Sequence, residues 1–265
     1  MQIPKPTLIL SLMVAVSLFM SQSVLADTIY LFGKIGEFPI SASMDRKEKD
    51  LSGWYFYHSQ AKQIRLEGHI DGHGTFRLEE TINYKKTGSF EGSVTQGRWA
   101  GTWRKTIDAA PLPFYLEENH NQLNNVSANY DCTAKERDAQ FHYTYRRKLK
   151  LAIAAGVVKA FRSDQGAAPD GYEEEQCSIE LAYMKQVASK VGILLQSKGE
   201  NAEEEAKKCT VRILGDSDIL WIRFGDTSQK GDDCRSTDSR IFCSPRIFWN
   251  DLILDRRTQK CKALK

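Results

Sequence analysis

The sequence predicts an α+β protein, in which an N-terminal antiparallel β meander (a small barrel or sandwich) precedes a disulfide-bonded helical hairpin with a small β sheet. Three observations lead to this fold class. Apolar and polar residues alternate through most of the first half of the chain. In the second half, apolar residues recur in steps of three and four. All six cysteines also lie in that second half.

The composition is that of a folded globular chain. Apolar residues make up 41% of the 265 residues and charged residues 27%, an apolar share too high for a disordered chain. The formal net charge is only +3, whereas nucleic-acid-binding domains carry a strong basic excess. We therefore expect no nucleic-acid partner.

Residues 1–26 have the features of a secretory signal peptide. Lys5 precedes an apolar run, Leu8–Met20, that is too short to cross a bilayer as a helix. Val24 and Ala26 suit the two small-residue positions of a signal-peptidase site. We expect cleavage near Ala26, a periplasmic location, and no integral membrane segment after cleavage.

Residues 27–118 are predicted to form the small all-β domain. Repeated alternation is typical of half-buried antiparallel strands, and we expect about eight of them. Asp71-Gly72 is a type I′ hairpin signal, and Gln96-Gly97 is a weaker turn. Glycines on the inner face permit strand bending, and large rings fill a narrow barrel, so we expect no ligand cavity. The residues expected inside include Gly33, Gly68, Gly101, Phe38, Phe76, Trp99, Trp103 and Phe114.

The second predicted domain, residues 132–265, follows an asparagine-rich linker at residues 119–131. Its first part has helical periodicity. Residues 133–136, Thr-Ala-Lys-Glu, match a capping box, and apolar residues then recur every four positions over residues 141–161. A similar apolar face covers residues 177–195, so we expect an antiparallel helical hairpin.

The small sheet is expected after the hairpin. Strands are predicted at Thr210–Leu214 and Ile219–Phe224, on either side of the Gly215-Asp216 turn. Residues 240–254 are apolar and β-prone, and extend the predicted sheet.

Three disulfides are expected, because an even number of cysteines follows a secretion signal. The starts of two antiparallel helices lie far apart, so Cys132 is not expected to reach Cys177. Cysteines that form disulfides have no free thiol. We therefore expect neither metal ligation by these cysteines nor a nucleophilic thiol at Cys243. The predicted pairing is Cys132–Cys209, Cys234–Cys243 and Cys177–Cys261.

Residues Lys230–Arg240 form a candidate binding loop, which the expected Cys234–Cys243 disulfide would rigidify. A rigid polar loop loses little entropy on binding, and protein inhibitors present such loops to enzyme clefts. An ordinary exposed loop is the alternative. The candidate binding residues are Asp232, Asp233, Arg235, Asp238 and Arg240.

Four consecutive aromatic residues are the second candidate binding feature. In a strand, two of them must point away from the barrel interior. This outer pair is either buried under the second domain or forms a partner-binding patch, and we favour burial between the domains. The four residues are Trp54, Tyr55, Phe56 and Tyr57.

Other clusters have ordinary explanations. His69 and His73 flank the predicted turn without a third ligand, so no metal site is expected. The basic run Arg146–Lys148 with Lys150 fits a solvated face or contact with an anionic surface. Acidic pairs such as Glu79-Glu80 do not reveal two carboxylates facing across a cleft, so no catalytic residue and no cofactor are assigned.

Glycine and aromatic residues recur together in the strand motifs Gly33–Ile40, Gly53–Tyr57, Ile64–Gly68, Gly97–Trp103 and Leu112–Phe114. With these motifs, the first domain resembles a small β domain that recurs in bacterial secreted proteins, a resemblance that implies no catalytic residue. Asp131-Cys132 is similar to the opening of LprI-type lysozyme inhibitors. This second resemblance implies an inhibitor.

We therefore expect a periplasmic, non-enzymatic protein that binds another protein. Export, disulfides and a filled barrel favour an inhibitor or immunity protein that occludes the cleft of a peptidoglycan-degrading enzyme, either lysozyme or a secreted effector. A structural or envelope-binding module is an alternative. A cell-wall hydrolase with carboxylates assembled between the domains is another.

Overall fold

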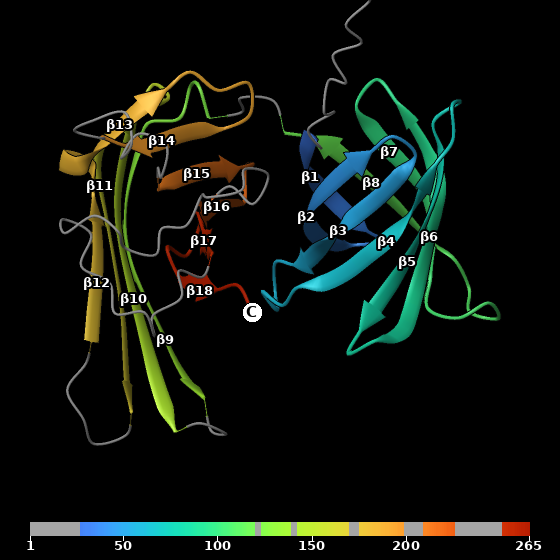
Figure 1. Ribbon diagram of the computed structural model, residues 1–265, viewed down its shortest axis with the longest axis horizontal. Helices are drawn as coiled ribbons and strands as arrows, with labels where there is room; N and C mark the ends of the chain where they lie inside the picture. Colours follow the sequence, from blue (N-terminus) through green and yellow to red (C-terminus); the bar gives the residue numbers. More distant parts are fainter. Residues whose placement is uncertain (1–26, 120–122, 139–141, 170–174, 199–208, 226–250) are drawn as a thin grey trace, which may run out of the picture.

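The computed structural model describes residues 27–119, 123–138, 142–169, 175–198, 209–225 and 251–265. Their strands form one closed barrel and two sheets (Figure 1). The barrel strands are β1 (Asp27–Ile35), β2 (Phe38–Lys47), β3 (Asp50–Tyr57), β4 (Ile64–Ile70), β5 (Thr75–Ile82), β6 (Lys85–Thr95), β7 (Arg98–Arg104) and β8 (Leu112–Glu118).

A four-stranded sheet follows in the order β12-β11-β10-β9, and a six-stranded sheet in the order β13 to β18. We call these two sheets together the sandwich. The first comprises β9 (Ala128–Asp138), β10 (Tyr143–Ala154), β11 (Val157–Pro169) and β12 (Glu175–Glu180). The second comprises β13 (Met184–Val187), β14 (Ile193–Ser197), β15 (Thr210–Gly215), β16 (Ile219–Phe224), β17 (Leu252–Asp255) and β18 (Cys261–Ala263), and the 3-10 turn η1 (Leu181–Tyr183) precedes it.

The predicted barrel is confirmed. Each of its strands pairs antiparallel with the next, and β8 closes the barrel against β1. Strand coiling in so small a barrel brings neighbouring backbones into close approach at glycine. A Cβ atom on Gly33 would lie 2.0 Å from the carbonyl oxygen of Tyr115, and one on Gly68 would lie 1.9 Å from that of Arg77. Any side chain at these two positions would push the strands apart.

Two details of the predicted barrel are wrong. Neither Asp71 nor Gly72 has a positive φ, so their hairpin is not a type I′ turn. It is a longer turn, in which Gly74 has φ +83°. Phe38 is 59% exposed instead of lying inside, because it follows the β1–β2 turn at the barrel end. The Gln96-Gly97 turn is confirmed, with φ values of 51° and 77°.

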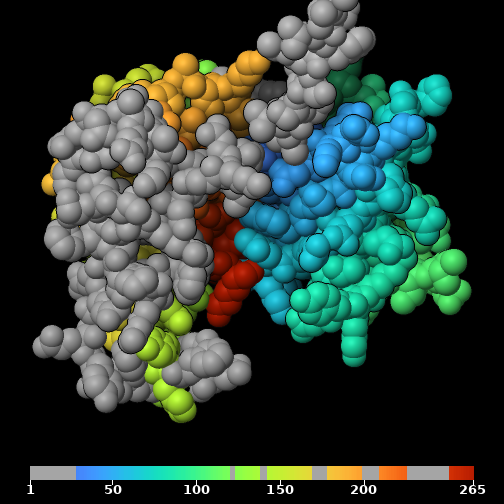
Figure 2. All heavy atoms as spheres, in the orientation of Figure 1, coloured from blue at the N-terminus to red at the C-terminus, as the bar shows by residue number. Residues whose placement is uncertain are grey.

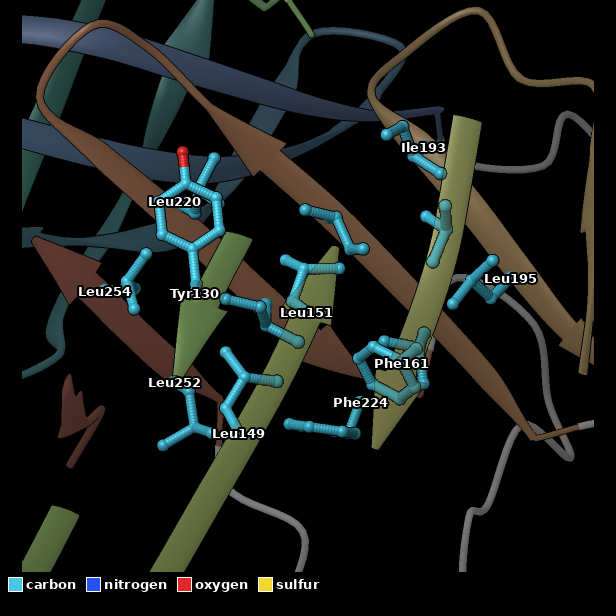
Figure 3. Packing of buried hydrophobic residues seen from close by; sticks show 14 of the residues in the cluster. Tyr130, Leu149, Leu151, Phe161, Ile193, Leu195, Leu220, Phe224, Leu252 and Leu254 are labelled. Carbon is cyan, nitrogen blue, oxygen red and sulfur yellow. The ribbon is translucent and has the colours of Figure 1, made fainter. Parts of the chain in front are cut away.

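The six-stranded sheet lies between the four-stranded sheet and the barrel (Figure 1). Apolar residues from both sheets fill the sandwich core and point toward one another (Figure 3). Every residue of β16, ILWIRF, is buried. Leu220 and Ile222 belong to the sandwich core, while Trp221 packs against the barrel. Burial of both faces explains why β16 is apolar almost throughout.

The predicted α+β class and its helical hairpin are wrong. The second domain is a β structure, and η1 is the one helical turn within the described ranges. Apolar residues four apart share a face of a helix, but they share a face of a strand as well, because four is a multiple of two. Leu149, Leu151 and Ile153 are buried, whereas Lys148 and Lys150 are exposed. This alternation distinguishes β10 from a helix.

The supposed helix boundaries also belong to strands. The capping-box residues 133–136 lie inside β9, as do residues 128–131 of the predicted linker. β10 and β11 meet at Ala155-Gly156, whose φ values of 47° and 75° form a two-residue turn. Alanine is unusual at such a position, so the sequence carries little sign of the turn. Residues 177–195 contribute to β12, η1, β13 and β14.

The strands predicted at Thr210–Leu214 and Ile219–Phe224 are confirmed as β15 and β16. In the part of the chain that the structure describes, no helix has the length and apolar character needed to cross a membrane.

Candidate functional site

The interior of the barrel is full of side chains. Its free volume is only about 10 Å³, which is at most the space of one water molecule. Phe76, Trp99, Phe90 and Phe114 contact one another through neighbouring ring edges and faces. The expectation of a filled barrel is therefore confirmed, and the barrel does not resemble a ligand-binding calyx.

One carboxylate is buried inside the barrel. Glu80 is 4% exposed and accepts hydrogen bonds from the Tyr55 hydroxyl at 2.7 Å, the Trp103 indole N–H at 2.9 Å and the Thr87 hydroxyl at 2.6 Å. Burial, and then the charge of Glu80, raises the pKa of the Tyr55 phenol far above its ordinary range. Tyr55 therefore remains protonated and donates to Glu80. All three hydrogen bonds to this carboxylate come from side chains of the barrel itself.

This network was missed because Glu79-Glu80 looks like an exposed acidic pair. Alternation along β5 could have revealed it, since Glu80 shares the inner face with Phe76 and Leu78. Its neighbour Glu79 is on the outer face and forms an ion pair with Lys86.

An open groove of about 580 Å³ lies on the surface, between the β2–β3 turn and strands β4 to β6. Ile70 and Phe76 contribute apolar surface to it. Its ionisable side chains are Lys49, Asp50, His69, Asp71, Arg77 and Glu91. We call this hollow the barrel groove.

The side-chain contacts within the barrel groove, one of them the ion pair of Arg77 with Glu91, are exposed and long. His69 Nδ1 lies 3.4 Å from Asp50 Oδ1, and Arg77 Nε lies 3.5 Å from Glu91 Oε1. Exposed pairs of this kind contribute little to stability. Both signs of charge are therefore available to a binding partner, whose own charged groups can replace these weak contacts.

A rigid turn borders the barrel groove. Asp71 Oδ1 accepts hydrogen bonds from the backbone N–H groups of His73 at 2.8 Å and Thr75 at 2.9 Å. These two bonds lower the pKa of Asp71, that from Thr75 most. Gly74 is tied to β6, because its carbonyl accepts from the N–H of Val94 at 2.9 Å. The turn, residues 71–75, is thus held in one conformation.

The aromatic run Trp54–Tyr57 divides as strand geometry requires. Tyr55 and Tyr57 face the barrel interior, while Trp54 and Phe56 face the sandwich. Ring centres of Trp54 and Phe56 lie 5.1 and 5.3 Å from that of Trp221. The outer pair is therefore covered by the second domain and is not a surface patch.

A buried cation joins the barrel to the sandwich. Arg223 Nε donates to Asp251 Oδ2 at 3.1 Å, and its Nη1 donates to the Tyr30 hydroxyl at 2.9 Å. The guanidinium lies 5.4 Å from the ring centre of Trp54 and 5.3 Å from that of Trp221. Burial raises the pKa of Asp251, and Arg223 opposes this effect. These groups satisfy one another, so the cluster is a structural junction.

The carboxylates that meet near this junction also have structural partners. Asp216 Oδ1 accepts from two backbone N–H groups at 2.8 and 2.9 Å. Asp218 forms an ion pair with Arg257 at 2.7 Å. Asp255 Oδ1 accepts from the backbone N–H groups of Arg257 and Thr258 at 2.9 and 2.8 Å. These contacts stabilise the turns in which the three carboxylates lie.

His58 is the titratable group that faces these carboxylates from the barrel side. Its Nε2 lies 2.9 Å from the Oγ of buried Ser41. Burial lowers the pKa of His58, and Asp216, Asp218 and Asp255 oppose that change.

We expect His58 to stabilise the protein more at pH 7.5 than at pH 5. Its pKa is lower in the folded state than the value of about 6.5 in an unfolded chain. The contribution is therefore complete above that unfolded value and is lost as the pH falls through the folded one. Urea denaturation of wild type and His58→Gln at both pH values measures it. An equal or larger difference between the two proteins at pH 5 would contradict the prediction.

Cys132 pairs with Cys261, with their Cα atoms 5.7 Å apart. The predicted pairs Cys132–Cys209 and Cys177–Cys261 are therefore wrong, although Cys209 is also disulfide-bonded. Both pairs follow from the expected helical hairpin, whose described residues lie mainly in strands instead. Cys132 lies on β9 and Cys261 on β18. These two strands are neighbours at the edge where the two sheets of the sandwich meet.

Several predicted features lie outside the described residues. These are the signal peptide, residues 1–26, and the loop residues Asp232, Asp233, Arg235, Asp238 and Arg240, with Cys234 and Cys243. Among the residues that are described, no group of three or more His, Cys, Asp or Glu side chains is arranged to hold a metal ion. His69 lines the barrel groove, and His73 lies in the turn beside it.

Comparison with known families, curated proteins and solved structures finds no match for this chain. The resemblances to a secreted β domain and to LprI-type inhibitors therefore stay predictions.

Proposed function

We propose that this chain is an exported, non-enzymatic binding protein that inhibits a peptidoglycan-degrading enzyme by covering its cleft. One contrast carries the proposal: the barrel interior has about 10 Å³ of space, whereas the open barrel groove has about 580 Å³. Small-molecule sites are enclosed hollows that bury most of the ligand. An open groove with charges of both signs suits another macromolecule.

The turn at residues 71–75 is the proposed contact with the enzyme. It is exposed except for half-buried Gly74, and it is held by hydrogen bonds at both ends. A segment already fixed in one conformation loses little entropy on binding, which favours affinity. The loop Lys230–Arg240 remains a second candidate contact.

The Cys132–Cys261 disulfide supports export, because disulfides persist in oxidising compartments. Together with the expected signal peptide, it supports a periplasmic location. The target enzyme would act in the same compartment.

We expect the purified protein to slow peptidoglycan hydrolysis by lysozyme or by a hydrolase that it captures from a periplasmic extract. The variant His73→Ala/Arg77→Ala should inhibit about tenfold less strongly, since it removes two exposed side chains at the contact. Arg65→Ala/Lys62→Ala is the matched control and should inhibit like wild type. Turbidity of a peptidoglycan suspension gives the rate.

Three outcomes would oppose the proposal. Capture of no hydrolase together with unchanged lysozyme rates would overturn it. Equal losses in both double variants would exclude the barrel groove and its turn as the contact. Clearing of peptidoglycan by the purified protein alone, in a zymogram, would favour the hydrolase alternative.

A further inference from the structure

Four basic residues share the outer face of the four-stranded sheet. Arg146 and Lys148 alternate with buried residues along β10, so they lie on the side away from the sandwich core. The register of β9 against β10 places Lys135 directly opposite Arg146 and Arg137 two residues further along the same face. We call Lys135, Arg137, Arg146 and Lys148 the basic face. The sequence run at residues 146–148 is therefore only half of it.

Other charges on the same side of the sheet are compensated. Lys150 pairs with Asp131 at 3.8 Å, and Arg162 pairs with two carboxylates, at 3.0 and 2.7 Å. Lys135 and Lys148 form no ion pair within the described part of the chain, and both are exposed. The proposal below rests on these two lysines.

Asp164 lies opposite Lys148 in the register, but it has other partners. Each of its oxygens accepts from Arg162 at 3.0 Å, and Oδ1 also accepts from the Ser178 hydroxyl at 2.6 Å. Its charge is therefore largely committed to Arg162.

Lys135 and Lys148 place two exposed positive charges on neighbouring strands, because Lys148 lies opposite Thr133 and Lys135 lies two residues further along β9 on the same face. A partner with dense negative charge would complement both lysines, and charge complementarity therefore identifies the partner as anionic.

We propose that the basic face binds the surface of a bilayer rich in anionic phospholipid. The interacting groups would be the lysine ammonium groups and the lipid phosphates. This attachment is independent of the proposed inhibition, which uses the barrel groove. It would concentrate the protein at a membrane surface without any segment entering the bilayer.

The composition of the face favours a bilayer over an acidic protein. The centre of a protein–protein interface is apolar, enriched in aromatic residues and depleted in lysine. Around the basic face, the neighbouring outward residues of β9 and β10 are Thr133 and Thr144. A group of cations with no apolar side chain among them matches the layer of phosphate charges at a bilayer surface. Each cation adds to the free energy of binding.

The purified protein should sediment with vesicles of phosphatidylglycerol and phosphatidylcholine, and not with vesicles of phosphatidylcholine alone. Lys135→Gln/Lys148→Gln should weaken this binding about 25-fold, that is roughly fivefold for each cation. Lys135→Arg/Lys148→Arg keeps both charges and should bind like wild type. Lys85→Gln/Lys105→Gln on the barrel makes the same change in net charge and should also leave binding unchanged.

Binding should be lost in high salt, because exposed charges are screened. Binding that persists at high salt, or a barrel variant as weak as the basic-face variant, would overturn the proposal. Poly-glutamate is the competitor for an acidic protein. If it binds as tightly as vesicles of equal charge, the partner is an acidic protein and the bilayer proposal fails. The circular dichroism spectrum of each variant confirms that it is folded.

Discussion

Replacing Trp221 with alanine is expected to lower the free energy of unfolding by about 3–5 kcal/mol. The ring is fully buried and contacts Tyr30, Phe32, Trp54 and Phe56 across the junction of barrel and sandwich. The substitution leaves a cavity there. It also removes the indole N–H that donates to Asp251 Oδ2 at 2.8 Å.

Because the lost contacts join two separate cores, the barrel and the sandwich should unfold in separate transitions in the Trp221→Ala variant. Differential scanning calorimetry resolves this change. Trp221→Phe keeps a ring and should cost about 1 kcal/mol, chiefly from the lost hydrogen bond. Tyr84→Ala, at a side chain that is 98% exposed, is the surface control and should change stability by less than about 0.5 kcal/mol. A single unshifted transition in Trp221→Ala would contradict the role assigned to this residue.

Removing the Cys132–Cys261 disulfide should lower the free energy of unfolding by about 2–5 kcal/mol. The bridge spans 129 residues of sequence, so it strongly restricts the unfolded chain. It also joins β9 to β18, which lie in different sheets of the sandwich. The double variant Cys132→Ala/Cys261→Ala avoids a free thiol, and urea denaturation measures the loss.

Tyr183→Ala is the reference variant for that series of urea denaturations. It changes a partly exposed side chain in η1 and leaves the disulfide in place. Peptide mapping without reduction tests the bridge directly and should release one peptide pair that contains Cys132 and Cys261. A peptide linking Cys132 to Cys209 instead would be incompatible with this fold. Stability of the double variant equal to that of wild type would show that the bridge does not hold the sheets together.

The barrel was predictable because its signals are local. Alternation in β4 and β5 marks the strands, and the ring-rich inner face indicates a filled interior. The turn at Gln96-Gly97 was also expected, because glycine readily adopts the positive φ that a tight turn needs. Phe38 and the Asp71 turn were misjudged, because the end of a barrel depends on where neighbouring strands stop.

The second domain was misjudged because its key spacing fits two structures. Residues such as Leu149 and Ile153 are four apart, which suits both a helix and a strand. Lysines on either side of Leu149, at positions 148 and 150, favour the strand, but the apparent capping box at residues 133–136 favoured the helix. The local preference of a four-residue motif is smaller than the stabilisation from pairing whole strands, so residues 133–136 form part of β9. The disulfide predictions were wrong because they assumed the helical hairpin.

The candidate site was only partly visible in the chain. His69 and His73 could be noted from their place beside a turn, but Arg77 and Glu91 join them only because β5 and β6 are paired. In the same way, residues 146–148 were visible as a basic run, while the contribution of Lys135 required the register of β9.

The amino-acid sequence alone specified the alternating strands and the filling of the barrel, since each depends on residues close together in the chain. Which cysteines pair and which tryptophan joins the domains depended on contacts between distant segments, while which charges share a face depended on the register of neighbouring strands. The distant contacts form because they bury both faces of β16, and no single segment can supply both covers.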